Sequence, residues 1–273
     1  MTAQERKPAM QLVLSLFPGI GLLDMAFEEE GFCIVRGPDV LWGGDIRKFH
    51  PPAGKFDGVI GGPPCQCFSS LAHMVRHNGH QPKFGNLIPE FERCVQEAEP
   101  QWFLMEEVVR TPQPKVTDYG VHTFVLNNRQ LGEAQNRKRR LSFGYRGSRQ
   151  ILMIDVVALE SRDFEYAACG GTHGEGGISR EQRGVGPAAE AARNRKRGSG
   201  KEKASLRRPS SWLGSNLKSG GSFKTLCRLQ GLPEDFLTDA PFTVAAKCKA
   251  VGNGVPLAMG RALAKAIAEL EDA

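Results

Sequence analysis

The sequence predicts an α/β fold in which a mostly parallel sheet carries helices on both faces. Short, uniformly apolar runs recur along residues 11–149, as is typical of strands that are buried on both sides of a sheet. Stretches with helical apolar spacing lie between some of these runs. Because strands that alternate with helices usually pair in parallel, these two observations together indicate the fold class.

The first unit reads as a strand, a glycine turn and a helix. Residues 11–16 are mostly apolar, the run ends at Pro18 and Gly19, and an amphipathic stretch from Leu22 to Glu30 stops at Gly31. The same reasoning predicts further strands at the short apolar runs 33–35, 57–60, 102–105, 122–126 and 141–143.

Two further helices are predicted from apolar spacing. Residues 87–98 have apolar positions one helical turn apart, with Pro100 just beyond the end. Residues 256–270 show the same pattern and form the last predicted element. The segment 223–232 is expected to be ordered as well.

The middle of the chain differs in composition from the rest. Residues 167–221 are rich in glycine, serine and arginine and contain too few apolar residues to build a core, so we expect loops or disorder there. We therefore expect three parts. These are a core over residues 1–149, a short, basic, glycine-rich region over 150–222, and a return segment over 223–273 that completes the core.

Composition limits the class of protein. A chain of 273 residues with 40% hydrophobic content is long enough for a substantial core. No apolar stretch approaches the ~18 residues of a membrane span, and the N-terminal residues are polar, so we expect a cytoplasmic protein. The net charge of +6 favours a polyanionic partner. The seven cysteines lack the paired spacing of zinc sites, so we expect reduced thiols and no metal.

The glycine turn and two aspartates are candidates for ligand binding. Gly19 and Gly21 allow the backbone to approach a ligand closely, and the following helix offers free N–H groups. Asp39 and Asp45 follow the next short segments, where a carboxylate can bind ribose hydroxyls or an adenine amino group. A tight turn without a ligand and two solvated aspartates remain the alternative.

Cys65 carries the strongest chemical signal. It lies in the sequence GGPPCQCFSS directly after a predicted strand. Because ligands bind at the carboxyl ends of parallel strands, a cysteine in a rigid Pro-Pro turn there is exposed and oriented as a nucleophile. The other cysteines are interpreted as small buried hydrophobic residues, with Cys67 pointing elsewhere.

Six motifs along the chain resemble those of the DNA cytosine-5 methyltransferases. The likeness covers residues 11–149 and 223–270 and leaves the basic middle unmatched. The matching segments are LSLFPGIGLLDMAFEEEGF, GGPPCQCFSS, FLMEEV, QNRKRRLSFG, RLQGLPEDF and VGNGVPLAMGRAL. This resemblance implies a Rossmann-like S-adenosyl-L-methionine-dependent methyltransferase fold with a small, irregular, basic DNA-recognition region.

The resemblance also implies the catalytic residues. Cys65 adds to C6 of cytosine, and Glu106 holds or protonates N3. Arg137 and Arg139 contact the base, the catalytic carboxylate or a phosphate. The reaction methylates C5 in a short DNA sequence after the cytosine has been flipped out of the duplex.

Further residues are carried over to the cofactor and to DNA. The resemblance assigns to S-adenosyl-L-methionine the residues Phe17, Gly19, Gly21, Leu22, Asp39, Asp45, Ile46, Pro64, Leu87, Asn253, Gly254 and Val255. It assigns to double-stranded DNA the residues Gln66, Ser69, Gln135, Arg193, Arg195 and Arg197. A loop over residues 71–85 is expected to close over the base.

This sequence departs from the family pattern at four places. Ser15 replaces an aspartate, Glu107 replaces the asparagine after Glu106, and Thr225 replaces a glutamate. A helix and part of a strand that are usual between Val35 and Gly44 are missing, so Asp39 is a weak substitute for the usual glutamate. Because Glu107 adds like charge beside Glu106, we expect the pKa of one of the two carboxyls to be raised.

The interpretation is a compact bacterial or phage-type DNA methyltransferase, acting as a monomer in the cytoplasm of the bacterium or the infected host. A cognate restriction endonuclease is left open as a partner. Two alternatives remain: the same chemistry on tRNA, and a DNA-binding relative with a decayed site. Comparing methyl transfer to tRNA with methyl transfer to duplex DNA tests the first alternative. Measuring cofactor binding tests the second, because a decayed site would bind no cofactor.

Overall fold

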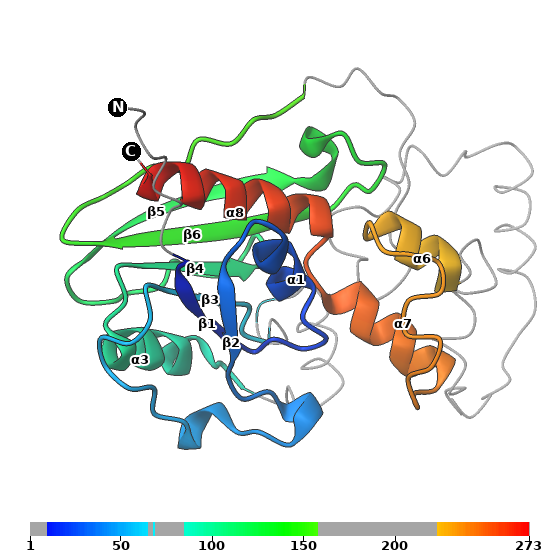
Figure 1. Ribbon diagram of the computed structural model, residues 1–273, viewed down its shortest axis with the longest axis horizontal. Helices are drawn as coiled ribbons and strands as arrows, with labels where there is room; N and C mark the ends of the chain where they lie inside the picture. The colour runs from blue at the N-terminus through cyan, green and yellow to red at the C-terminus, as the bar shows by residue number, and fades with distance from the viewer. Residues whose placement is uncertain (1–9, 65–67, 69–84, 158–222, 273) are drawn as a thin grey trace, which may run out of the picture.

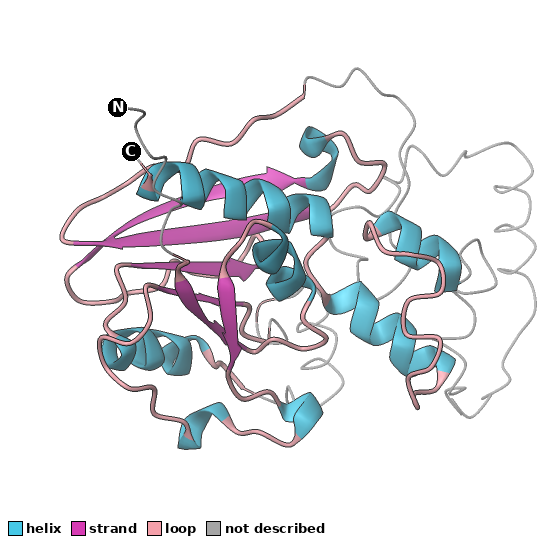
Figure 2. Ribbon diagram, in the orientation of Figure 1, coloured by secondary structure: helices cyan, strands magenta, loops and turns pink. Residues whose placement is uncertain are grey.

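The computed structural model describes residues 10–64, 68, 85–157 and 223–272. Within these residues a six-stranded sheet has the order β2-β1-β3-β4-β6-β5. Its strands are drawn as magenta arrows in Figure 2. The strands are β1 (Leu12–Leu16), β2 (Cys33–Arg36), β3 (Gly58–Gly61), β4 (Trp102–Glu107), β5 (Tyr119–Asn127) and β6 (Lys138–Arg146). The helices are α1 (Leu22–Glu29), α3 (Ile88–Ala98), α6 (Phe223–Leu229), α7 (Val244–Asn253) and α8 (Leu257–Glu271).

Four strands of the sheet are parallel, and of these β1, β3 and β4 are largely buried, whereas the edge strand β2 is largely exposed. β1 pairs with β2 and β3, and β3 pairs with β4, all in parallel. β6 is inserted antiparallel between β4 and β5. The predicted mostly parallel α/β fold is confirmed, with the antiparallel hairpin at one edge.

Helices cover both faces of the sheet, as predicted. On one face, Phe27 of α1 and Ile267 of α8 join the core cluster that contains Trp102 and Leu104. On the other face, Phe91 of α3 joins the cluster that contains Phe103. Consecutive residues of β4 therefore point into opposite layers, because strand side chains alternate.

The C-terminal segment is part of the same core as the N-terminal segment. α8 lies across β5 and β6 and packs against α1 (Figure 1). A Cβ at Gly260 would lie 2.5 Å from the Cβ of Ala26, so the two helices approach as closely as a glycine allows. α6 and α7 contribute Leu226 and Val251 to a third cluster with Leu22 of α1.

Several elements differ from the sequence prediction. α7 was not predicted from the sequence. Only two short 3-10 turns, η1 (Val40–Trp42) and η2 (Ile46–Lys48), lie between β2 and β3, which confirms the missing helix. Among the helices that the structure describes, none combines the length and the hydropathy needed to cross a bilayer.

Candidate active site

The catalytic candidates from β4 and β6 meet at the carboxyl end of the sheet. A Cβ at Gly62, which directly follows β3, would lie 3.2 Å from Oε2 of Glu106. The carboxylate of Glu106 therefore lies against the start of the turn that leads to Cys65. Cys65, Gln66 and Ser69 themselves lie outside the described residues, as does most of the loop predicted over 71–85.

Arg139 and Glu106 form an ion pair. The distance between Arg139 Nε and Glu106 Oε1 is 2.7 Å, and the two side chains are 16% and 10% exposed. Such a pair, shielded from bulk water, is stronger and more strictly oriented than a surface pair. The structure thus brings together two of the four catalytic candidates.

Arg137 connects the catalytic strand to the C-terminal part of the chain. It is buried, and its Nη2 donates a hydrogen bond to the carbonyl oxygen of Gly254 at 2.9 Å. Gly254 in turn packs on Leu22, because a Cβ at Gly254 would lie 2.5 Å from Leu22 Cδ1. Asn253, Gly254 and the buried Val255 therefore lie beside the start of α1, and their assignment to the cofactor stays a prediction.

Gln135 and Leu22 are buried more completely than a ligand-contacting role requires. Gln135 has no exposed surface, and neither of its amide atoms has a hydrogen-bond partner among the described residues. Leu22 is 2% exposed and packs in the cluster with α6 and α7. Both assignments remain predictions. Arg193, Arg195 and Arg197 lie outside the described residues.

Glu107 points into the opposite layer from Glu106 and is 2% exposed. Its Oε2 accepts hydrogen bonds from the Val108 backbone N–H at 3.0 Å and from Thr111 Oγ1 at 3.3 Å. Burial, followed by the charge of Glu106, raises the pKa of Glu107 to about 8. The carboxyl whose pKa is raised is thus that of Glu107, which lies on the opposite side of β4 from Glu106.

The glycine turn adopts the conformation that its sequence predicts. Phe17, Gly19 and Gly21 all have positive φ values, of 56°, 58° and 78°. No described atom lies within 4 Å of a Cβ placed on Gly19, so the turn is open on that side. An open turn of positive-φ glycines lets a ligand contact the backbone.

Asp39 and Trp42 attach the η1 segment to this turn. One oxygen of Asp39 accepts a hydrogen bond from the Gly19 N–H at 3.0 Å, and the other accepts from the Leu41 N–H at 2.7 Å. Trp42 donates from Nε1 to the Gly19 carbonyl at 2.8 Å while 63% of the residue stays exposed. Its ring lies 6.4 Å from that of Phe242, which precedes α7.

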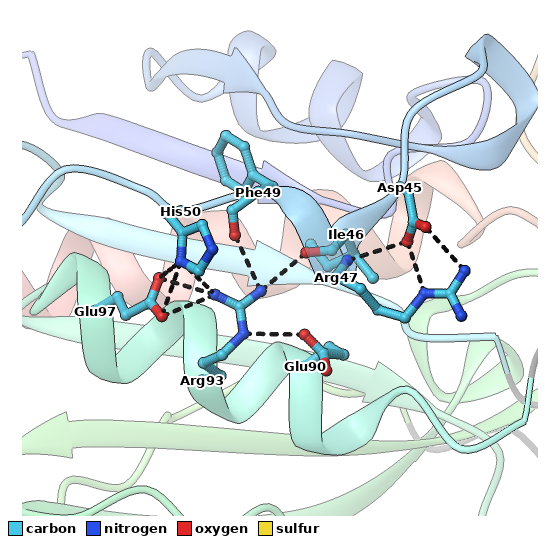
Figure 3. A network of polar contacts seen from close by, with 8 residues as sticks. All are labelled: Asp45, Ile46, Arg47, Phe49, His50, Glu90, Arg93 and Glu97. Atoms are coloured by element: carbon cyan, nitrogen blue, oxygen red, sulfur yellow. Dashed lines mark hydrogen bonds and ion pairs between the residues drawn. The ribbon is translucent and has the colours of Figure 1, made fainter.

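Asp45 and Ile46 lie in the next turn, shown in Figure 3. Asp45 accepts hydrogen bonds from Arg47 Nε at 2.9 Å and Nη2 at 2.8 Å, and these contacts lower the pKa of its carboxyl. Ile46 is 4% exposed and shares a core cluster with the residue that caps α3, Leu87.

Sequence reasoning missed a buried polar contact at position 15. Ser15 donates from its hydroxyl to Asp24 of α1 at 2.5 Å, and Asp24 also forms an ion pair with Arg36 of β2 at 2.8 Å. Trp42 was missed too, although an aromatic residue three positions after a candidate ligand aspartate is a usable signal.

Among the described residues, no group of three or more His, Cys, Asp or Glu side chains is arranged to hold a metal ion.

Comparison with known proteins relates this site to one family. A family model described as C-5 cytosine-specific DNA methylase matches residues 41–170. The chain is 31% identical over 163 residues to the type II methyltransferase M.FnuDI of Fusobacterium nucleatum, covering 49% of this chain and 46% of the relative. It is 30% identical over 182 residues to the type II methyltransferase M.AquIA of Picosynechococcus sp., covering 49% of this chain and 71% of the relative.

The chain belongs to the C-5 cytosine-specific DNA methylase family. The cofactor of this family is S-adenosyl-L-methionine. The match to M.FnuDI extends over about half of that relative's length. The fold is also similar to that of the Entamoeba histolytica methyltransferase EhMeth, with a TM-score of 0.57, 11% identity, and coverage of 97% of this chain and 99% of that one.

Proposed function

We propose that this C-5 cytosine-specific DNA methylase family member methylates C5 of cytosine within a short sequence of double-stranded DNA. One observation carries the proposal. The buried Glu106 carboxylate, paired with Arg139, lies against Gly62, and the chain reaches Cys65 three residues later. A positioned carboxylate beside a nucleophile's turn is what addition to a cytosine ring requires.

Cys65 is the proposed nucleophile. Its thiolate forms a bond to C6 of the ring, and the electron pair of the C5–C6 double bond then makes C5 able to attack a methyl group. S-adenosyl-L-methionine, when bound, supplies that methyl group. Loss of the C5 proton to a base restores the double bond, the C6–S bond breaks, and Cys65 leaves as a thiolate.

Glu106 is the proposed partner of N3. It stabilises the charge that develops on the ring when sulfur adds to C6, either as a hydrogen-bond partner or by giving a proton. Arg139 fixes the carboxylate from β6 through the 2.7 Å contact. Arg137, anchored on Gly254, sets the position of that strand end.

The target base must leave the duplex to reach these groups. We assign contacts with DNA to Gln66, Ser69 and Gln135 and to the basic residues Arg193, Arg195 and Arg197. In this proposal the region 150–222 reads the target sequence, and residues 1–149 and 223–273 form the catalytic core.

The residues around the glycine turn suit an adenosine-containing cofactor. Asp39 and Asp45 supply carboxylate acceptors for hydroxyl and amino donors, and the exposed face of Trp42 suits a flat ring. The open side of Gly19 gives backbone access. We therefore propose that Phe17, Gly19, Gly21, Ile46, Pro64 and Leu87 complete the pocket, with Leu22, Asn253 and Val255 behind it.

The cellular setting is part of the proposal. We propose a monomer that acts in the cytoplasm of a bacterium or a phage-infected host and protects DNA there. A cognate restriction endonuclease would be its functional counterpart.

Transfer of labelled methyl from S-adenosyl-L-methionine to unmethylated duplex DNA tests the function. We expect transfer by the parent and by Cys33→Ala, which alters an exposed cysteine on β2, and only background with Cys65→Ala. Bisulfite sequencing of the product then identifies the target sequence. Label that enters tRNA instead of DNA, or transfer that survives Cys65→Ala, would contradict the proposal.

A further inference from the structure

Arg93 of α3 is the centre of a polar network that the reaction described above does not use (Figure 3). Its Nε donates to Glu90 at 2.9 Å, and its Nη1 donates to both oxygens of Glu97 at 2.8 Å. Its Nη2 donates to the backbone carbonyls of Ile46 and Phe49, both at 2.9 Å. Every nitrogen of the guanidinium is thus engaged.

The two carbonyls belong to the turn that carries Asp45. η2 begins directly after Asp45 and is a single 3-10 turn, in which the Ile46 carbonyl accepts one hydrogen bond, from the Phe49 N–H at 3.1 Å. Arg93 adds a second donor to that carbonyl and a donor to the Phe49 carbonyl, from a helix more than forty positions away in sequence. A planar guanidinium can do this, whereas a lysine ammonium presents one point charge.

The guanidinium is itself held firmly. Glu90 and Glu97 lie one turn before and after Arg93 on the same helix, and His50 Nδ1 lies 3.1 Å from Glu97. The hydrogen bonds to Glu97 and Glu90 raise the pKa of Arg93 despite partial burial, and the pKa of Glu97 is lowered by Arg93 and His50. The side chain of Arg93 is 27% exposed, which limits exchange with water.

We propose that Arg93 is a positioning residue for the adenine end of the cofactor, holding the Asp45 turn at a fixed distance from α3. The inference rests on the proposed function. α3 begins directly after Leu87, and Ile46 packs in the same cluster as Ile88 and Phe91. Asp45 and Leu87 can therefore contact the same ligand only if the η2 turn is packed against α3. Arg93 provides the polar contacts of that packing.

Binding of S-adenosyl-L-methionine to the DNA-free protein, measured by calorimetry, tests this inference. For Arg93→Met we expect the Kd to rise at least tenfold, while kcat at saturating cofactor stays within about twofold of the parent. Arg93→Lys is expected to fall between the two. Arg261→Met is the matched control, because Arg261 also donates hydrogen bonds to a carboxylate, that of Glu29. This contact joins α8 to α1.

A second readout separates positioning from a general loss of structure. The parent should prefer S-adenosyl-homocysteine over the analogue in which oxygen replaces the adenine amino group, since Asp45 accepts from that group. This preference should shrink in Arg93→Met. Backbone amides of residues 46–49 should also exchange hydrogen faster in the ligand-free variant, with other regions unchanged.

The outcomes are distinct. A folded Arg93→Met with the parent's Kd and the parent's preference between the two analogues would overturn the inference. If Arg93→Met does not fold, the Lys variant decides, and an unchanged Kd there would overturn it equally. No binding of S-adenosyl-L-methionine to the parent would instead reject the proposed function on which the inference rests.

Discussion

At the scale of single residues, two adjacent carboxyls of β4 behave differently because they face different layers. Glu106 meets a guanidinium, whereas Glu107 is buried and meets a backbone N–H and a threonine hydroxyl. The second environment favours the neutral acid. The glutamate that replaces the usual asparagine therefore keeps a hydrogen-bonding group behind the site, and its raised pKa favours the uncharged form.

Glu107 makes stability depend on pH in a defined direction. Its pKa is about 8 in the folded protein against 4.5 for an ordinary glutamate, so the folded state binds the extra proton between these values. The contribution of Glu107 to the free energy of unfolding is fully present below about pH 4.5 and is lost as the pH rises through about 8. The loss amounts to at most about 1.4 kcal/mol per pH unit. Glu107→Gln should remove this slope, as measured by urea denaturation between pH 5 and 9.

The control for Glu107 is Glu269→Gln on α8, where 62% of the carboxylate side chain is exposed. It should leave the pH dependence of the parent unchanged. A constant difference in unfolding free energy between the parent and Glu107→Gln across this pH range would show that Glu107 does not titrate as described.

At the scale of elements, the contact between α1 and α8 determines how the two ends of the chain combine. Gly260 faces Ala26 so closely that an added Cβ would lie 2.5 Å from the Ala26 Cβ. That atom is fixed to the α1 backbone and cannot rotate away. The helices must therefore separate if position 260 gains a side chain.

Gly260→Ala should destabilise the protein by about 1–3 kcal/mol through overpacking, although alanine is the better helix former by about 1 kcal/mol. Chemical denaturation measures the difference. Gly260→Val should cost more than Gly260→Ala, because its branches add to the same clash. An alanine variant more stable than the parent would mean that the helices can shift without loss.

The elements that could be predicted are those with a local signal. β1 and α1 follow from an apolar run, a glycine turn and an amphipathic stretch. α7 was missed although Thr243 caps it with a hydrogen bond from the Ala246 N–H, because few of its residues are buried, namely Cys248, Val251 and Gly252, and they give a weak apolar pattern. The insertion of β6 between β4 and β5 has no local signal, since strand order depends on long-range pairing.

At the scale of the whole molecule, the site draws on segments from both ends of the chain. Motif spacing could identify Glu106, Arg139 and Gly254 as candidates, but only the folded chain shows which contacts they make. Arg139 forms an ion pair with Glu106, whereas Arg137 donates a hydrogen bond to the Gly254 carbonyl. The hydrogen bonds from Arg93 to Ile46 and Phe49 could not be predicted from the sequence, because their acceptors are backbone carbonyls, which every residue type has.

The covalent step through Cys65 is the central claim, and trapping tests it most directly. In duplex DNA with 5-fluorocytosine at the target position, the fluorine cannot leave as a proton does, so the Cys65–C6 bond should persist after methyl transfer. Mass spectrometry should find the nucleotide attached to the peptide that contains Cys65, only when S-adenosyl-L-methionine is present, and never with Cys65→Ala. Methylated product formed without any adduct, or an adduct on another cysteine, would contradict the account.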